Sequence, residues 1–312
     1  MKPIVALAGG VGAARFLDGL ARVVNPEHLF VIGNTGDDAE IHGLHISPDL
    51  DTVMYTLAGL ANPKHGWGIR GDTFHCLEAL RQLGGEAWFQ LGDRDLATHI
   101  YRTERLRQGQ TLSQVTSDLA AALGVKAVLV PMSNERVRSL ICTKAGELEF
   151  QTYFVRRRAR DRVLNVRFSG IENAKPAPGI LAAIRDAAAI VLCPSNPFIS
   201  INPILAVHGV RDALRRNRSR VVAISPIVGG RALKGPAGHM MKSMRSRAAA
   251  VEVASMYADF LGAFVLDEED RRQSSDVEKL GIRPVVTNTI MRGIKERKVL
   301  AKTIVGELKI DS

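Results

Sequence analysis

The sequence predicts an α/β protein with a doubly wound, mainly parallel, Rossmann-like sheet and a smaller β-rich and helical insert. Short apolar runs alternate with amphipathic runs of helical length, as in strands that are joined by crossover helices. Several apolar runs end in glycine, asparagine or serine, which is typical of strands that open into ligand-binding loops. We expect the 312 residues to form one domain, with the insert around residues 137–175.

The first apolar run, residues 4–8, is followed by Gly9, Gly10 and Gly12 and then by an amphipathic segment. This order predicts a buried strand, a glycine turn and a helix, and the free N–H groups at a helix start bind anions. We interpret the turn as a phosphate-facing loop, with a tight turn that binds no ligand as the alternative. Arg15 replaces the third glycine of a dinucleotide fingerprint and no acidic residue ends the second strand, so NAD binding is not expected. The P-loop pattern is also absent.

A second buried strand is predicted over residues 28–33, and a long polar segment follows it up to residue 51. This segment holds Asn34 and four aspartates, which should lie at the carboxyl edge of the sheet: Asp37, Asp38, Asp49 and Asp51. A helix follows over residues 52–61, with two of these aspartates at its start. One carboxylate suffices as a helix cap, so the second suggests a further role.

The middle of the chain predicts a helix from Asp72, as its cap, to residue 81, a strand over 86–91 and a helix starting around Gly92. Thr111 and Gln114 form a plausible capping box for the next helix, and a strand follows over 125–130. The insert has β-like runs at 137–143, 147–155 and 163–168. Thereafter strands are predicted at 189–193, 220–224, 263–266 and 283–287, and helices at 178–188, 203–216 and 248–261.

Composition and charge narrow the possible partners. The formal net charge of +10 favours anionic partners, and arginines and lysines cluster at 156–167, 211–220 and 242–247. Aromatic residues make up only 5% and do not interleave with these clusters, so no base-stacking platform is indicated. We favour a solvated basic face over a field that attracts an anionic substrate, and we do not expect nucleic acid as a partner.

The cysteines and the apolar runs bear on the compartment. Cys76, Cys142 and Cys193 are scattered without a C-x-x-C pair, which suggests a reducing compartment and no structural zinc. The N-terminal apolar run is too short for a signal peptide, and no run approaches the ~18 residues of a membrane span. We therefore expect a cytoplasmic protein without a membrane partner.

Motifs from the first strand to about Arg271 closely resemble the 2-phospho-L-lactate transferase family, which builds the deazaflavin coenzyme F-420. The matching segments are AGGVGAARFLDGL, NTGDD, ISPDLDTVMYTLAG, WGIRGDTF, LGDRDLATHI, PMSNERV, CPSNPFISINPI and ISPIVGGRALKGPAG. The pair ISPDLDT and LGDRDxATH, in that order, is the most specific.

The resemblance implies a single transferase domain with a defined chemistry. A phospholactyl, phosphoenolpyruvyl or similar phospho-three-carbon-acid group would move from a guanosine diphosphate ester to the terminal ribityl hydroxyl of the deazaflavin Fo. GMP would leave, Mg²⁺ would be the cofactor, and the resemblance favours a homodimer. The sequence does not reveal which three-carbon acid is transferred.

The resemblance also assigns roles to residues. Asp51 and Arg94 would lie at the deazaflavin, with Asp93 as a further substrate contact, and Asp51 would position or deprotonate the attacking hydroxyl. Asp49 is the best Mg²⁺ candidate and a catalytic residue, because carboxylates suit this ion. Asp37 is the second metal candidate, with Asp93 and Asp95 as lesser ones. The guanosine diphosphate should be surrounded by Gly10, Gly12, Asn34, Ser195, Asn196, Ser225 and Gly229.

Each of these assignments has a plainer alternative. Arg94 could form an ion pair with Asp93 or Asp95, and the segment from Ser195 could be a turn with a helix cap. We interpret His42, His45 and His99 as ordinary loop or helix histidines, because no zinc-like H-x-x-x-H pair is present. The competing function is a non-catalytic, UDP-sugar-binding regulator of the same superfamily, whose sequences lack the pairing of ISPDLDT with GDRDxATH.

Overall fold

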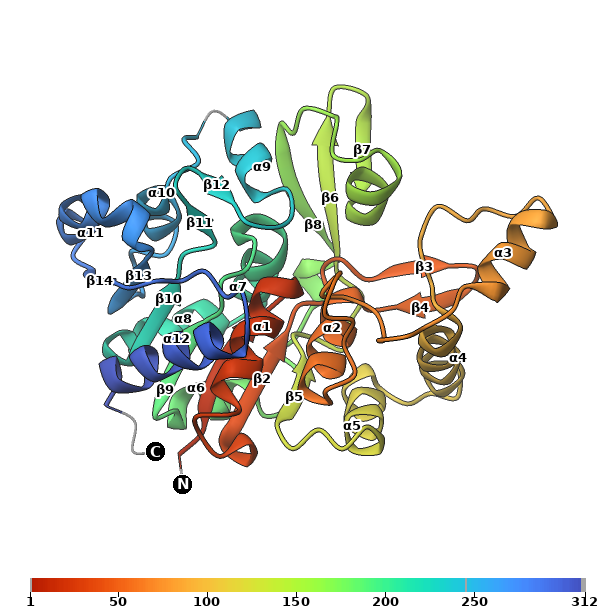
Figure 1. Ribbon diagram of the computed structural model, residues 1–312, viewed down its shortest axis with the longest axis horizontal. Coiled ribbons are helices and arrows are strands. Elements are labelled where there is room, and N and C mark those ends of the chain that lie inside the picture. The colour runs from red at the N-terminus through yellow and green to blue at the C-terminus, as the bar shows by residue number, and fades with distance from the viewer. Residues whose placement is uncertain (1, 245, 310–312) are drawn as a thin grey trace.

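Seven parallel strands form the central sheet of the computed structural model, which describes residues 2–244 and 246–309 (Figure 1). Their order across the sheet is β14-β13-β10-β9-β1-β2-β5. The strands are β1 (Ile4–Ala8), β2 (Leu29–Gly33), β5 (Val128–Pro131), β9 (Ala189–Leu192), β10 (Val221–Ile224), β13 (Ala263–Leu266) and β14 (Arg283–Val286). The predicted doubly wound, Rossmann-like α/β class is confirmed.

The direction in which the chain adds strands reverses beside β1. This strand pairs in parallel with β2 on one side and with β9 on the other. After β5 the chain returns to β9 and then continues outward through β10, β13 and β14. The loops after β1 and β9 therefore flank the crevice at the switch point, where open α/β sheets bind their ligands.

Helices cover both faces of the sheet because successive residues of each strand point to opposite sides. In β1, Ile4, Ala6 and Ala8 join one core cluster, whereas Val5 and Leu7 join the other. The first face carries α1 (Gly10–Leu20), α2 (Pro48–Leu57), α5 (Leu112–Ala122) and α12 (Ile294–Glu307). The second carries α6 (Ile180–Asp186), α7 (Asn202–Ala206), α8 (Val210–Arg216), α10 (Ala250–Ser255) and α11 (Ser274–Lys279).

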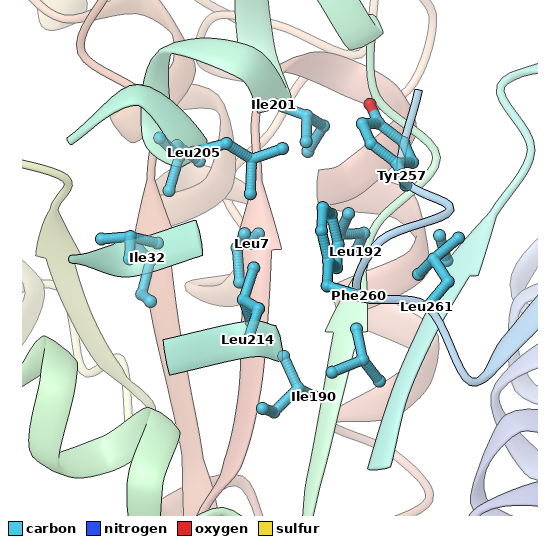
Figure 2. Close-up of a cluster of buried hydrophobic side chains, with 14 of the residues drawn as sticks. Leu7, Ile32, Ile190, Leu192, Ile201, Leu205, Leu214, Tyr257, Phe260 and Leu261 are labelled. Atoms are coloured by element: carbon cyan, nitrogen blue, oxygen red, sulfur yellow. The ribbon is translucent and has the colours of Figure 1, made fainter. Parts of the chain in front are cut away.

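Figure 2 shows the second core cluster, in which Leu7, Ile190 and Leu192 of the central strands meet side chains of the covering segments. The labelled side chains are aliphatic or aromatic and almost fully buried. The apolar interior fixes the strand ends in space, so the polar loops at the carboxyl edge start from rigid positions. Among the helices of the described ranges, none is long and apolar enough to cross a bilayer.

An arm projects beyond the edge strand β5 and carries β3 (Ala39–Ile41), β4 (Leu44–Ile46), α3 (His75–Gln82) and α4 (Asp93–Arg107) (Figure 1). The segment after β2, which we expected to be a long loop, is largely a β3–β4 hairpin. Its turn residues His42 and Gly43 both have positive φ, as a two-residue hairpin turn requires. Helix α2 starts at Pro48, so Asp49 and Asp51 lie in its first turn.

The insert forms a separate antiparallel sheet in which β6 (Arg138–Thr143) lies between β7 (Gly146–Glu149) and β8 (Asn165–Ser169). The run that we expected to be one strand over 147–155 ends at Glu149. A π-helical turn, η2 (Thr152–Arg156), follows, because Phe150 and Tyr153 bury their rings in a small core under the insert. The β-rich and helical character predicted for this part is therefore observed.

Three other expectations differ from the structure, and one helix was not expected. Residues 86–91 form no strand, since Trp88 and Phe89 pack on the β3–β4 hairpin instead of joining a sheet. The predicted helix over 203–216 is divided into α7 and α8, and Gly209 with φ of 79° precedes α8. The helix predicted over 248–261 is only α10, followed by turns. Helix α12, which buries Leu300 and Ile304 against the first face, was not predicted.

The remaining elements are short. They are β11 (Ile227–Val228), β12 (Arg231–Ala232), α9 (Ala237–Ser243) and the helical turns η1 (Pro26–His28), η3 (Ile171–Asn173), η4 (Pro197–Ile201), η5 (Arg218–Arg220) and η6 (Glu268–Gln273).

Candidate active site

The glycine turn after β1 packs tightly against its protein neighbours. A Cβ atom on Gly12 would overlap the carbonyl oxygen of Pro194, which belongs to the loop after β9. A Cβ on Gly9 would overlap the carboxylate of Asp49. Gly10 has φ of +71°, which favours glycine. Close packing at the switch point thus explains these glycines, and phosphate binding by the turn stays a prediction.

Asn34, which follows β2, links two of the predicted metal ligands. Its Nδ2 donates hydrogen bonds to Asp49 Oδ2 at 2.9 Å and to Asp37 Oδ1 at 3.2 Å. The same amide contacts the carbonyl oxygen of Ile199 at 3.0 Å, and its Oδ1 accepts from the N–H of Gly36 at 2.9 Å. The structure therefore brings Asn34, Asp37 and Asp49, three of the residues singled out in the sequence, into one buried cluster.

Burial makes this pair of carboxylates costly to ionise. It raises the pKa of Asp49 to about 7, although hydrogen bonds from Asn34, Ser200 and the Gly10 N–H oppose the shift. Burial and the neighbouring Asp49 charge raise the pKa of Asp37 well above its usual range. A cation between or beside the two carboxylates would relieve both costs.

These residues fit Mg²⁺. No group of three His, Cys, Asp or Glu side chains suited to a metal is found within residues 2–244 and 246–309. Mg²⁺ commonly takes only one or two protein carboxylates and completes its shell with phosphate oxygens and water. Asp37 and Asp49 could supply these two carboxylates, whereas a closed, all-protein metal cage is not indicated.

Asp51 forms a buried ion pair with Arg102 of α4. Arg102 Nη1 lies 3.1 Å from Asp51 Oδ2, and Nη2 pairs with Oδ1. The Asp51 side chain is 6% exposed and the Arg102 side chain is 1% exposed. His99 Nδ1 lies 3.7 Å from Asp51 Oδ2. Both carboxylate oxygens of Asp51 are therefore engaged by Arg102, a residue that sequence reasoning missed.

The polar contacts between α2 and α4 continue beyond this ion pair. Tyr55 Oη donates to Asp95 Oδ1 at 2.7 Å and lies 2.8 Å from Thr98 Oγ1, whose hydroxyl can donate to it. His99 Nε2 lies 3.3 Å from Asp95 Oδ1. Asp95 is thus engaged in holding the two helices together, and its place as a lesser metal candidate receives no support from these contacts.

Arg94 presents an exposed guanidinium at the start of α4. Among the described residues it forms no ion pair, so neither Asp93 nor Asp95 neutralises it; its Nη1 lies 3.5 Å from the carbonyl oxygen of Arg70. No hydrogen bond or ion pair of the described residues joins Arg94 to Asp51, which pairs with Arg102 about two turns further along α4.

Two aspartates near Arg94 serve as helix caps, in an arrangement that the sequence did not reveal. Asp93 accepts hydrogen bonds from the N–H groups of His75 and Cys76 at the start of α3. Asp72 accepts from the N–H groups of Arg94 and Asp95 at the start of α4. The expectation that Asp72 caps the helix that follows it is therefore wrong. Sequence order misled because each carboxylate caps the other segment's helix.

Of the candidates in the loops after β9 and β10, Asn196 and Ser225 stabilise their own turns, and Ser195 and Gly229 bond to other segments. Asn196 Oδ1 accepts from the N–H of Phe198 and caps η4, as its alternative interpretation stated. Ser225 Oγ bonds to both backbone polar groups of Ile227. Ser195 Oγ accepts from the N–H of Gly9 at 3.2 Å, and Gly229 donates to Asp270 Oδ2 at 3.0 Å. Their contacts with a guanosine diphosphate stay predictions.

Two cations beside the glycine turn were missed because they are far apart in the sequence. Arg15 of α1 is half-buried, and Lys234, after β12, is exposed. Burial lowers the pKa of both side chains, and the positive charge of Arg15 lowers the pKa of Lys234 further. The ion pairs of the described residues include neither. Lys234 Nζ donates to the carbonyl oxygen of His65 at 2.9 Å. This unneutralised charge favours an anionic ligand near the turn.

Three of the six arginines in the basic cluster over 156–167 pair with acidic neighbours. Arg156 pairs with Glu86 at 2.8 Å, and Arg157 pairs with Asp161 at 2.6 Å. Arg167 pairs with Glu147 at 2.6 Å. These exposed pairs agree with the interpretation of a solvated face.

The parallel sheet and its carboxyl edge define a Rossmann-like α/β protein with paired buried carboxylates and free cations at the switch point. The model of a family described as 2-phospho-L-lactate transferase CofD matches residues 4–304. The chain therefore belongs to this transferase family of coenzyme F-420 biosynthesis, and the resemblance noted in the sequence is confirmed.

Curated relatives agree over nearly the full length. A 2-phospho-L-lactate transferase from Methanothermobacter thermautotrophicus is 42% identical over 305 residues, covering 98% of each chain. A phosphoenolpyruvate transferase from Streptomyces griseus is also 42% identical over 305 residues, covering 96% of each. In fold, the chain is similar to a UPF0052 family member from Bacillus halodurans, with a TM-score of 0.63, 15% identity and coverage of 97% and 98%.

Proposed function

We propose that this protein transfers a phospho-three-carbon-acid group from a guanosine diphosphate ester to the ribityl hydroxyl of Fo, with GMP as the leaving group. The observation that carries this proposal is the buried Asn34, Asp37 and Asp49 cluster at the switch point, next to a glycine turn with two unneutralised cations. Transfer at a diphosphate depends on positioning and charge neutralisation, and these groups supply both.

On the donor side, Asp49 and Asp37 would hold Mg²⁺. The bound ion would supply charge neutralisation for the diphosphate. Asn34 fixes both carboxylates through one amide, as residues outside a metal's ligand shell commonly do. Arg15 and Lys234 add positive charge beside the turn. The remaining donor contacts would come from Gly10, Gly12, Ser195, Asn196, Ser225 and Gly229.

On the acceptor side, Asp51 would orient the attacking hydroxyl and Arg94 would contact the deazaflavin, with Asp93 near by. The ion pair with Arg102 holds the Asp51 carboxylate in one orientation. A loose transition state demands a well-placed nucleophile more than a strong base. Arg94 offers a planar set of donors that no protein carboxylate within the described ranges occupies.

The relatives do not select the three-carbon acid. One that is named for phospholactate and one that is named for phosphoenolpyruvate are equally identical to this chain. The acids differ by a methyl, methylene or hydroxymethyl group, so a small change in a pocket decides between them. We also propose a homodimer from the resemblance, which sedimentation analysis would test.

Titration with Fo tests the proposal against the non-catalytic alternative. We expect a saturable change in deazaflavin fluorescence when Fo is added. We also expect GDP to compete with the donor ester for its binding site. A protein that binds UDP-sugars but gives no response to Fo would overturn the proposal and favour the regulator.

A further inference from the structure

The segments around Asp72 and Asp93 interlock residue by residue, although they belong to two different sequence motifs. Asp72 Oδ1 accepts from the N–H of Arg94 at 2.8 Å, and its Oδ2 accepts from the N–H of Asp95 at 3.1 Å. Asp93 returns the contact: its Oδ1 accepts from Cys76 N–H at 3.0 Å. The starts of α3 and α4 therefore cap each other.

Thr73 adds a further connection between the segments. Its Oγ1 donates to Asp93 Oδ2 at 2.6 Å, and its carbonyl oxygen accepts from the N–H of Asp93 at 2.8 Å. The N–H of His75 donates to the same Oδ2 at 3.0 Å. Both oxygens of Asp93 are thus occupied by the protein.

Gly92 gives independent support for the interlock. Its φ of −75° lies in a region open to every residue, so no backbone strain calls for glycine there. A Cβ at this position would overlap the carboxylate of Asp72. The glycine in LGDRD is therefore explained by the close approach of the aspartate in RGDT.

Arg94 is the residue whose backbone this interlock fixes. Its guanidinium is exposed and unpaired among described residues, so packing does little to hold it. Apart from the 3.5 Å contact of its Nη1 with the Arg70 carbonyl oxygen, what holds Arg94 is its N–H bond to Asp72 at the N-terminus of α4. An uncapped first turn frays, which would spread the guanidinium over many positions.

We propose that Asp72 is a positioning residue for acceptor binding, which acts by fixing the start of α4 and with it Arg94. This inference rests on the proposed function, in which Arg94 contacts Fo. Asp93 serves the same interlock from the other side.

The test measures Fo binding, KM and kcat for Asp72→Ala. Loss of a helix cap is expected to weaken Fo binding and raise its KM about fivefold or more, with affinity for GDP unchanged. Asp72→Asn keeps an acceptor oxygen and should recover most of the affinity. Gly92→Ala, which pushes against the Asp72 carboxylate, should act in the same direction as Asp72→Ala.

Two further measurements separate positioning from a general loss of stability. Thr111→Ala removes the cap of α5, outside the site, and should leave the KM for Fo unchanged. Asp72→Ala should weaken Fo binding when Arg94 is present. In an Arg94→Ala background it should weaken Fo binding no further, because Asp72 acts through Arg94. Hydrogen exchange at the amides of Arg94 and Asp95 should accelerate in Asp72→Ala.

The outcomes distinguish the two levels of the account. Wild-type protein that fails to bind Fo contradicts the proposed function itself. If the wild-type protein binds Fo and Asp72→Ala binds it equally well, the positioning role alone is overturned. The same holds if the effects of Asp72→Ala and Arg94→Ala on Fo binding are fully additive.

Discussion

Replacing Asp51 with asparagine should destabilise the fold as well as slow the reaction. The substitution leaves the Arg102 guanidinium, whose side chain is 1% exposed, without its main counter-charge. Removing one partner of a buried ion pair costs about 3–5 kcal/mol of unfolding free energy. The nearby Asp38 charge also favours ionised Arg102, so we expect a value near the lower end of this range.

Urea unfolding followed by circular dichroism measures this cost. The matched control is Asp186→Asn, which breaks an exposed pair with Arg185 and should leave the unfolding midpoint nearly unchanged. In Asp51→Leu combined with Arg102→Met both charges are absent, so much of the stability should return. A loss below about 1 kcal/mol for Asp51→Asn would refute the buried ion pair.

The same double variant separates stability from catalysis. If Asp51 orients the attacking hydroxyl, turnover of the restabilised protein should remain at least ~10²-fold below wild type, while GDP still binds. Recovery of turnover together with stability would show that Asp51 only supports the fold.

Three other substitutions or conditions test separate parts of the site. Gly12→Val should lower the thermal midpoint as well as GDP affinity, because its side chain would meet the Pro194 carbonyl; an unchanged midpoint in calorimetry would contradict this packing. Arg94→Lys should weaken Fo binding in fluorescence titration and spare GDP, since lysine lacks the planar fork. The pKa of Asp49 is raised to about 7, so a proton competes with Mg²⁺ for this carboxylate below that pH. Calorimetry should therefore show about tenfold weaker Mg²⁺ binding at pH 6 than at pH 8. Asp49→Asn should weaken this pH dependence, leaving the part that the raised pKa of Asp37 contributes, and show partial rescue of turnover at high Mg²⁺. A pH-independent affinity in the wild type would argue against Asp49 as a ligand.

The stability of the metal-free protein should change with pH in the direction opposite to Mg²⁺ affinity. Because the folded state keeps a proton on Asp49 up to about pH 7 and the unfolded state loses it near 3.8, unfolding free energy from this group falls as pH rises through that window. Urea midpoints at pH 5 and pH 7, with Asp49→Asn as the control, would detect it.

The fold was predictable because each buried strand is a short apolar run that ends in small or polar residues. Pairing of β1 with both β2 and β9 follows from the doubly wound rhythm, and it brings Asn34 to the crevice. The meeting of Asp37 with Asp49 was anticipated only in outline, since the hairpin that folds between them was expected to be a loop.

Contacts between distant segments account for what the sequence did not reveal. Arg102 resembles any surface arginine on a helix until Asp51 is placed opposite it. Asp72 looks like the cap of the next helix, because nothing local shows that Asp93 takes that place. Arg15 and Lys234 likewise become one feature only when the glycine turn and the loop after β12 meet.

Mass spectrometry of the reaction product tests the central claim most directly. The protein would be incubated with Fo, Mg²⁺ and, separately, the phospholactate, phosphoenolpyruvate and phosphoglycerate esters of guanosine diphosphate. The account predicts that one donor yields Fo carrying the phospho-acid group and an equimolar amount of GMP, and that chelation of Mg²⁺ abolishes both. Absence of any Fo adduct with all three donors, from protein that is folded and binds GDP, would contradict it.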